Sequence, residues 1–253
     1  MDIYVYDFLD KRQIEDIKLL VDERKNYENS SLEFPYDDKD SVFVLIYDND
    51  KLLFCMALSF INTGSYELIF FSLPKEDEKE LFKATLDRLK LYMREALSVS
   101  FSEILLLSDT DSGAKLAKEL DFPLFNKEFY LYYDYEGFTT YDNKIYSNIS
   151  FDFGNFITYH ISDERKGYKN FLKFNITKFS KDTFYLYGFY VKERYRNKKN
   201  AKKALPYILQ LLYEGGVKKI LLQVSGFNKA ALSLYEGFGF KAYQEISYYK
   251  VRD

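Results

Sequence analysis

The sequence predicts an α/β protein with mixed sheets, in which two copies of one fold follow each other. Apolar runs typical of strands alternate with amphipathic helical segments, which favours sheets covered by helices. The order of these elements recurs at one offset, since Leu73 corresponds to Val191 and Phe122 to Phe240, 118 residues apart in both cases. The chain has 253 residues, 47% of them hydrophobic, which suffices for the cores of two domains of ordinary size.

The first copy is predicted to open with a strand over residues 3–8 and an amphipathic helix over 14–24. The helix is indicated by apolar residues at three- and four-residue spacing, and the polar stretch 26–41 is expected to be irregular. Asp48-Asn49-Asp50 is a turn signal between two strands of a hairpin. A third strand over 65–73, a helix started by Pro74, a strand over 103–107, a short helix over 111–122 and a strand over 125–134 complete this copy.

The second copy is expected to begin with consecutive strands between residues 147 and 179. It has no counterpart of the helix over 14–24. A strand over 184–191, a helical stretch, a strand over 218–224 and a helical segment over 228–240 then repeat the later order of the first copy. We place the boundary near Glu136, which divides the chain into domains 1–136 and 137–253.

A basic segment follows the strand over 184–191, where that strand is expected to meet a helix. Backbone N–H groups in the first turn of a helix lack intrahelical partners, and the helix dipole adds about half a positive charge there, so the turn suits a diphosphate. The net charge of the chain is −3, so this concentration of cations is local and favours a phosphate-bearing ligand over a solvated lysine-rich helix face. The cations, opposed only by Glu193, are Lys192, Arg194, Arg196, Lys198, Lys199, Lys202 and Lys203.

Two segments of the second copy resemble motifs of the GNAT N-acetyltransferase family. Arg196-Asn197-Lys198-Lys199-Asn200-Ala201 is similar to the acyl-CoA pyrophosphate motif [QR]-x-x-G-x-[GA], with Lys199 at the position of the family's glycine. Asn228, Ala231 and Tyr235-Glu236-Gly237-Phe238-Gly239-Phe240 resemble the segment N-x-x-A-x-x-x-Y-E-x-x-G-F. The resemblance covers the second half closely and the first half mainly in element order, and it implies tandem GNAT-like domains.

The resemblance implies that acetyl-CoA is the co-substrate and that the acetyl group passes to a primary amine. A small molecule or a peptide would carry the amine. The implied cofactor-binding residues are Phe189, Tyr190 and Val191 for the pantetheine arm, and Arg196, Asn197, Lys198, Lys199, Asn200, Ala201, Lys202 and Asn228 around the pyrophosphate. Tyr235 corresponds to the tyrosine that protonates the leaving thiolate, and a phenol suits this role because it stays protonated at neutral pH. Several groups remain candidates for the general base: Glu193, Glu245, Asp163 and Tyr187.

The first copy lacks these features at the corresponding positions. Ala117 stands at the position of Tyr235, and Thr110 at that of Asn228. Its helix is approached by the acidic segment 75–78, which would repel a diphosphate. We therefore expect this copy to be degenerate and to have lost its cofactor site.

Composition excludes several other classes of protein. The single cysteine, Cys55, excludes an internal disulfide, and the single histidine, His160, excludes a metal site built from several His and Cys ligands. Neither a signal peptide nor an apolar run long enough for a membrane span is evident, so we expect a cytoplasmic protein with no membrane partner. Overall acidity argues against a nucleic-acid partner.

The principal alternative is a catalytically inactive binding or scaffold protein that retains the fold. Lys199 brings a Cβ and a long side chain to a position where glycine allows close approach to the backbone. Pro206 either kinks the helix or shifts its start to about Lys202, which would displace the anion site. The sequence leaves open the identity of the acceptor, and whether an exposed sheet edge pairs two chains into a homodimer.

Overall fold

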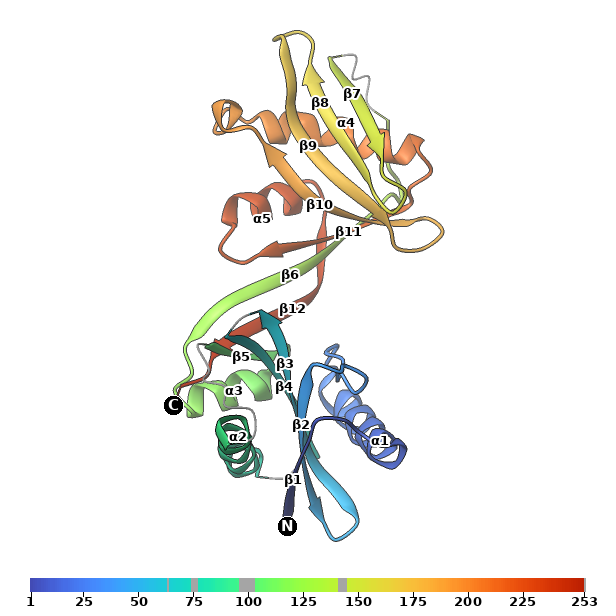
Figure 1. Cartoon of the computed structure of the whole chain (residues 1–253). Coiled ribbons are helices and arrows are strands. Elements are labelled where there is room, and N and C mark those ends of the chain that lie inside the picture. Colours follow the sequence, from blue (N-terminus) through green and yellow to red (C-terminus); the bar gives the residue numbers. More distant parts are fainter. Residues whose placement is uncertain (63, 74–76, 96–102, 141–144, 253) are drawn as a thin grey trace. The chain divides into compact units, whose positions relative to one another are not determined.

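The computed structural model describes residues 1–62, 64–73, 77–95, 103–140 and 145–252, and Figure 1 shows their arrangement into helices and strands. The chain forms two compact units of mixed α/β structure. The first unit comprises Met1–Lys127 together with Ile246–Asp253, and the second comprises Glu128–Glu245. The sequence suggested one boundary near Glu136, whereas the contacts place the divisions inside two strands.

The sheet of the first unit has the strand order β1-β2-β3-β4-β5-β12. Neighbouring strands are antiparallel except β4 and β5, which are parallel over residues 65–68 and 103–106. The strands are β1 (Asp2–Tyr6), β2 (Ser41–Asp48), β3 (Lys51–Asn62), β4 (Ser65–Ser72), β5 (Glu103–Ser108) and the second half of β12 (Lys241–Lys250). The helices are α1 (Lys11–Glu28), α2 (Glu78–Glu95) and α3 (Asp111–Glu119). Pro74, predicted to start a helix, lies outside the described residues.

Helices cover both faces of this first sheet, because its strands carry apolar side chains on both sides. Figure 1 shows α1 and α2 on opposite sides of the strands. α1 contacts β3 and β4, and its residues Ile17 and Leu20 are buried. On the other face, α2 and α3 pack onto a core that includes Leu68 and Leu106. Burial on both faces explains the nearly continuous apolar runs of β2 and β3.

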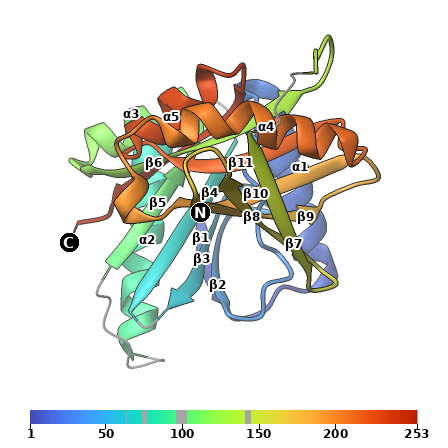
Figure 2. The ribbon, with the colours of Figure 1, turned by 90° about the horizontal axis from the view of Figure 1, so that it is seen from above.

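The sheet of the second unit has the order β12-β6-β11-β10-β9-β8-β7. Its strands are the first half of β12, most of β6 (Leu124–Asp134), β7 (Tyr146–Asp152), β8 (Ile157–Asp163), β9 (Tyr168–Lys178), β10 (Thr183–Val191) and β11 (Lys219–Ser225). A short 3₁₀ turn (Glu193–Tyr195) leads into α4 (Asn200–Glu214), and α5 (Lys229–Glu236) follows β11. α4 and α5 lie on the same side of the strands in Figures 1 and 2, where residues such as Leu205 and Leu232 join the core formed with Ile220 and Leu222.

The offset of 118 residues seen in the sequence also relates hydrogen bonds in the two units. The N–H of Phe122 donates to the carbonyl of Ala117, and the N–H of Phe240 donates to that of Tyr235. Thr110 caps α3 as Asn228 caps α5, each side chain accepting from the N–H three residues later. The parallel pairs β4/β5 and β10/β11 also correspond: Ser65 pairs with Glu103, and Thr183, 118 residues later, pairs with Lys219, two residues before the position equivalent to Glu103.

The last strand of each copy completes the sheet that contains most of the other copy. Residues 128–134 of β6 pair with β11 in the second unit. Residues 247–250 of β12 pair with β5 in the first unit. Consequently neither copy, taken as a continuous segment, contains all the strands of its sheet.

Among the described residues, no helix combines the length and the apolar character needed to cross a membrane.

Candidate functional site

β10 and β11 separate part-way along their length in the second unit. They pair in parallel only from Thr183–Lys219 to Tyr185–Leu221. Just beyond this point the register of β10 against β9 shifts between Tyr187 and Tyr190, and Gly188 there has a φ of 62°. A Cβ at Gly188 would lie 2.7 Å from the side-chain nitrogen of Asn175, so both its backbone conformation and its surroundings favour glycine. The bulge bends β10 away from β11.

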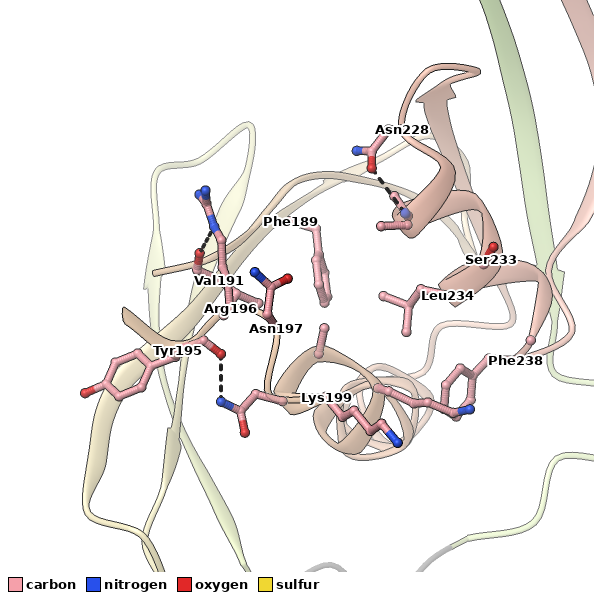
Figure 3. Close-up of a pocket in the computed structure, with 16 residues that line it drawn as sticks. Phe189, Val191, Tyr195, Arg196, Asn197, Lys199, Asn228, Ser233, Leu234 and Phe238 are labelled. Atoms are coloured by element: carbon pink, nitrogen blue, oxygen red, sulfur yellow. Dashed lines mark hydrogen bonds between the residues drawn. The ribbon is translucent and has the colours of Figure 1, made fainter. Parts of the chain in front are cut away.

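A cavity of about 530 Å³ lies beside the separated part of β10. Figure 3 shows Phe189 of β10 and Leu234 of α5 pointing toward each other across it. The lining residues come from β10, the start of α4 and one side of α5: Phe189, Val191, Tyr195, Arg196, Asn197, Lys199, Asn200, Ala201, Lys202, Asn228, Ala230, Ala231, Ser233, Leu234, Gly237 and Phe238. The cavity therefore joins a basic turn to an apolar wall.

The first turn of α4 faces this cavity. Lys199 precedes the helix with φ 57° and ψ 18°, the left-handed conformation that glycine adopts most easily. The turn expected at the family's glycine position is thus formed by a lysine. Its carbonyl accepts the first helical hydrogen bond, from Lys203, so the N–H groups of the three residues between them have no partner four residues earlier in the helix. Those three residues all line the cavity.

Asn200 anchors the start of the helix. The residue is 4% exposed, and its Nδ2 donates to the carbonyl of Tyr195 at 2.8 Å. Its Oδ1 accepts from Nζ of Lys166 at 3.2 Å. These contacts hold the 3₁₀ turn against α4 and fix the direction in which the free N–H groups point.

The structure brings most of the predicted cofactor-binding residues to this cavity. Tyr190 is not among its lining residues, because side chains alternate along a strand and the ring of Tyr190 lies on the other face of the sheet. There the Arg196 guanidinium lies 4.9 Å from the ring centre, with Nε donating to the carbonyl of Val191. Lys198 is also outside the lining, and its Nζ donates to the carbonyl of Arg194 at 3.0 Å.

Pro206 lies inside α4, which begins at Asn200. The suggestion that the helix starts near Lys202 is therefore wrong, and the anion site is not displaced in that way. The missing N–H of Pro206 leaves the carbonyl of Lys202 without its usual helical donor. This gap falls after the turn that lines the cavity, so that turn keeps helical geometry.

Tyr235 lies in α5 and is almost fully buried beside the cavity, rather than among the residues that line it. Its ring centre is 6.1 Å from that of Phe189 and 5.2 Å from that of Phe240. Burial raises the pKa of the Tyr235 hydroxyl above its usual value. The phenol is therefore held in its protonated form at neutral pH.

The side of α5 that lines the cavity belongs to the segment that resembles the second GNAT motif. The sequence did not predict that this side binds the cofactor. Ala230 and Leu234 lie four residues apart on one side of α5, and Phe238 follows just after the helix ends; this spacing could have indicated one helix face. Asn228, predicted to contact the cofactor, also caps α5, because its Oδ1 accepts from the N–H of Ala231 at 3.1 Å.

The four candidates for a general base do not line the cavity. Glu193 has an 82% exposed side chain 3.9 Å from Arg196, and Asp163 is buried and accepts from the N–H of Lys166. The ring of Tyr187 packs near Tyr185. Among the described residues, no group of three or more His, Cys, Asp or Glu side chains could hold a metal ion.

Residues 122–240 match the model of the acetyltransferase (GNAT) family. This segment is a GNAT domain. It contains all of the cavity-lining residues, from Phe189 to Phe238. The family model thus covers the splayed strand, the basic turn of α4 and the whole of α5.

Solved structures of GNAT proteins have the same fold over nearly the whole chain. A GCN5-related N-acetyltransferase from Sphaerobacter thermophilus aligns with a TM-score of 0.67 and 8% identity, covering 98% of this chain and 95% of the other. A tandem GNAT protein from the clavulanic acid biosynthesis pathway aligns with a TM-score of 0.59 and 8% identity, covering 99% and 98%. No curated protein shows a significant sequence match. At these identities the likeness establishes the fold alone.

In the first unit, the positions equivalent to the GNAT cavity enclose a space of only about 30 Å³. Phe71, Glu78, Thr110 and Gly113 line it, each 118 residues before a residue that lines the larger cavity. Arg24 from α1 fills this region, donating to Glu78 at 2.7 Å and to Glu28 at 3.1 Å. Ser72 and Ser112 bind the same charged groups through their hydroxyls.

Proposed function

We propose that the GNAT domain transfers an acetyl group from acetyl-CoA to a primary amine. The observation that carries this proposal is the cavity at the splay, where the first turn of α4, whose N–H groups lack helical partners, adjoins an apolar wall. Lys199 and Lys202 add positive charge at that turn, which suits the diphosphate of the cofactor. Phe189 and Leu234 supply an apolar surface for the pantetheine arm and the acetyl group.

In the proposed reaction the neutral amine nitrogen attacks the thioester carbonyl carbon. The new C–N bond forms as the C–S bond breaks, and the leaving thiolate takes a proton. Tyr235 is the proposed donor, since a phenol is protonated at neutral pH and its ring packs against Phe189 at the apolar wall. The nitrogen loses its extra proton to a base or to solvent, and the Tyr235 phenolate takes up a proton from solvent, so that no net proton is gained or lost.

The second candidate function is a binding protein without turnover. Two observations favour it: Lys199 occupies the position of the family's glycine, and Tyr235 is buried beside the cavity instead of lining it. This candidate predicts acetyl-CoA binding without acetyl transfer, or no acetyl-CoA binding.

Calorimetric titration with acetyl-CoA distinguishes these functions when three variants of the full chain are compared. Ala201→Glu places a negative charge at the proposed diphosphate site and should weaken binding by about tenfold or more. The matched control is Lys83→Glu, because Lys83 is the equivalent position on α2 of the first unit and is exposed. Tyr235→Phe should keep the binding of acetyl-CoA.

Turnover is then measured as amine-dependent release of free CoA thiol. The enzyme proposal expects Tyr235→Phe to slow this release while leaving acetyl-CoA affinity unchanged. Absence of wild-type binding at millimolar acetyl-CoA would reject the proposal and leave the scaffold function in its place.

A further inference from the structure

In the part of the second unit that the structure describes, the helices cover only one face of the sheet. α4 and α5 pack on the face that carries Ile220 and Leu222. Side chains of directly paired residues share a face, so the pairs Tyr185–Leu221 and Leu221–Tyr132 place both tyrosines on the other face. The same alternation places further residues there: Glu128, Tyr130, Tyr187 and Gln223.

Tyr243 of β12 extends this surface. Its ring centre lies 6.2 Å from those of Tyr130 and Tyr132, and the residue is 52% exposed. We call the surface formed by Glu128, Tyr130, Tyr132, Tyr185, Tyr187, Gln223 and Tyr243 the tyrosine face. In the first unit, helix α1 packs on one face of the sheet and α2 on the other, so the open face is a difference between the two units.

Tyrosine rings on this side of the sheet already hold cations from the chain itself. Nζ of Lys219 lies 5.3 Å from the ring centre of Tyr132. The Arg196 guanidinium and the Lys173 ammonium lie 4.9 and 5.8 Å from that of Tyr190. These distances are in the range of cation–π attraction. Within the described part of the chain, no Lys or Arg lies over Tyr185, Tyr187 or Tyr243.

A carboxylate stands beside these unoccupied rings. The Tyr185 hydroxyl donates to Oε1 of Gln223 at 3.2 Å, and Nε2 of Gln223 donates to the Glu128 carboxylate. This chain of side chains crosses from β10 over β11 to β6. Tyr185 is also the last residue of β10 that pairs with β11, so the chain borders the place where the strands separate. Burial, with Tyr243 and Glu128 nearby, raises the pKa of the Tyr185 hydroxyl, as expected for groups gathered in one cluster.

We propose that the tyrosine face binds the protonated amine of the acceptor, through Glu128 and the rings of Tyr185 and Tyr243. The inference rests on the proposed acetyl transfer. If acetyl-CoA occupies the cavity on the helix-covered face, the acceptor must approach the thioester from the opposite face, where β10 and β11 are unpaired. Carboxylate and aromatic rings together select a cation with an apolar or aromatic arm. The acceptor class is therefore an alkyl or arylalkyl primary amine that is charged at neutral pH.

The test measures binding of phenethylamine to the full chain by saturation-transfer NMR, with 2-phenylethanol as a neutral analogue of similar shape. We expect phenethylamine to bind at least about threefold more tightly than the alcohol. Glu128→Gln and Tyr243→Ala should each remove most of this preference, whereas Tyr243→Phe, which keeps the aromatic ring, should retain it. Asp152→Asn removes a carboxylate elsewhere in the second unit and serves as the matched control for Glu128→Gln.

Equal binding of the two compounds, or a preference that survives both Glu128→Gln and Tyr243→Ala, would overturn the inference. Acetyl-CoA titration of the same variants separates this failure from failure of the proposed function. If both variants bind acetyl-CoA, transfer the acetyl group and still prefer phenethylamine over 2-phenylethanol, the role of the tyrosine face is rejected, whereas the proposed acetyl transfer is not. The amine measurement needs no acetyl-CoA, so it tests the face even if the cavity binds no cofactor.

Discussion

Glu78 and Arg196 occupy equivalent positions, 118 residues apart, and carry opposite charges at the starts of equivalent helices. Glu78 begins α2 and accepts a 2.7 Å hydrogen bond from Arg24, inside a space of about 30 Å³. Arg196 precedes α4 and borders a cavity of about 530 Å³. One copy thus satisfies its helix start with its own side chains, whereas the other leaves that start open to a ligand.

This difference predicts one acetyl-CoA per chain. The Arg24 cluster fills the equivalent space in the first unit and places carboxylates where a diphosphate would lie. Calorimetry of the wild type should therefore give a stoichiometry of one, and Ala201→Glu should leave no second site of similar affinity. A stoichiometry of two, or a site that persists in Ala201→Glu, would show that the first unit also binds the cofactor.

Loss of Arg24 should destabilise the first unit strongly. Its side chain is 9% exposed and neutralises two carboxylates that are themselves mostly buried. Arg24→Met leaves Glu28 and Glu78 unpaired, and we expect the free energy of unfolding to fall by about 3 kcal/mol. Urea unfolding followed by circular dichroism measures the change. Arg12→Met removes an exposed arginine from the same helix and should change stability little; equal effects of the two variants would contradict this role for Arg24.

Gly188→Ala should impair both folding and cofactor binding. The positive φ costs about 1–2 kcal/mol for a residue with a Cβ, and the contact with Asn175 adds to this cost. Gly167→Ala is the control, since φ is 65° there and the added Cβ meets nothing within 4 Å. We expect both variants to lose thermal stability but only Gly188→Ala to lose acetyl-CoA affinity. Unchanged affinity in Gly188→Ala would argue against the bulge as a determinant of the site.

Lys199→Gly should raise the free energy of unfolding by about 0.5–1 kcal/mol. Glycine relieves the left-handed strain of Lys199, and this gain exceeds its extra loss of chain entropy on folding. Lys203 lies inside the same helix, so Lys203→Gly should instead lower the free energy of unfolding by about 1 kcal/mol. Thermal unfolding measures whether each variant is more or less stable than the wild type. Destabilisation by Lys199→Gly would show that the lysine side chain stabilises the turn.

Alkaline stability should depend on the buried tyrosines. Burial raises the folded-state pKa of Tyr235 and of Tyr135 above the unfolded value of about 10. The folded state therefore binds these protons more tightly, and the associated stability is present below pH 10 and lost as pH rises above it. Tyr235→Phe should flatten the decline of unfolding free energy above about pH 10. An unchanged slope in Tyr235→Phe would contradict this contribution of the Tyr235 hydroxyl.

Local patterns in the sequence predicted much of the fold. The hairpin at Asp48-Asn49-Asp50, the helices and the repeated order of elements depend on short-range periodicity and turn chemistry. The turn before α4 is of the same kind, because it involves residues only a few positions apart. The capping of α5 by Asn228 is equally local, although the sequence was interpreted there only as a cofactor contact. The basic turn of the cavity was therefore visible in the chain.

The exchange of β6 and β12 between the two sheets was not predictable in this way. The pairing of strands depends on contacts between segments far apart in the sequence. An apolar strand pattern indicates that a face is buried, but it does not indicate which strand lies next to it. For the same reason, the sequence did not predict the contact of Arg24 with Glu78, which lies 54 residues away. It also did not predict the burial of Tyr235, whose motif position indicates a chemical type but no exposure.

By itself, the sequence determined that this protein consists of two related α/β copies, and that a basic turn follows a strand in the second of them. Periodicity, capping and turn residues act over a few positions, and these can be read along the chain. Only the tertiary structure decided which copy has an open cavity, which strands complete each sheet, and that Tyr185, Gln223 and Glu128 meet on one face. Those outcomes depend on packing and pairing between distant segments, which no local pattern encodes.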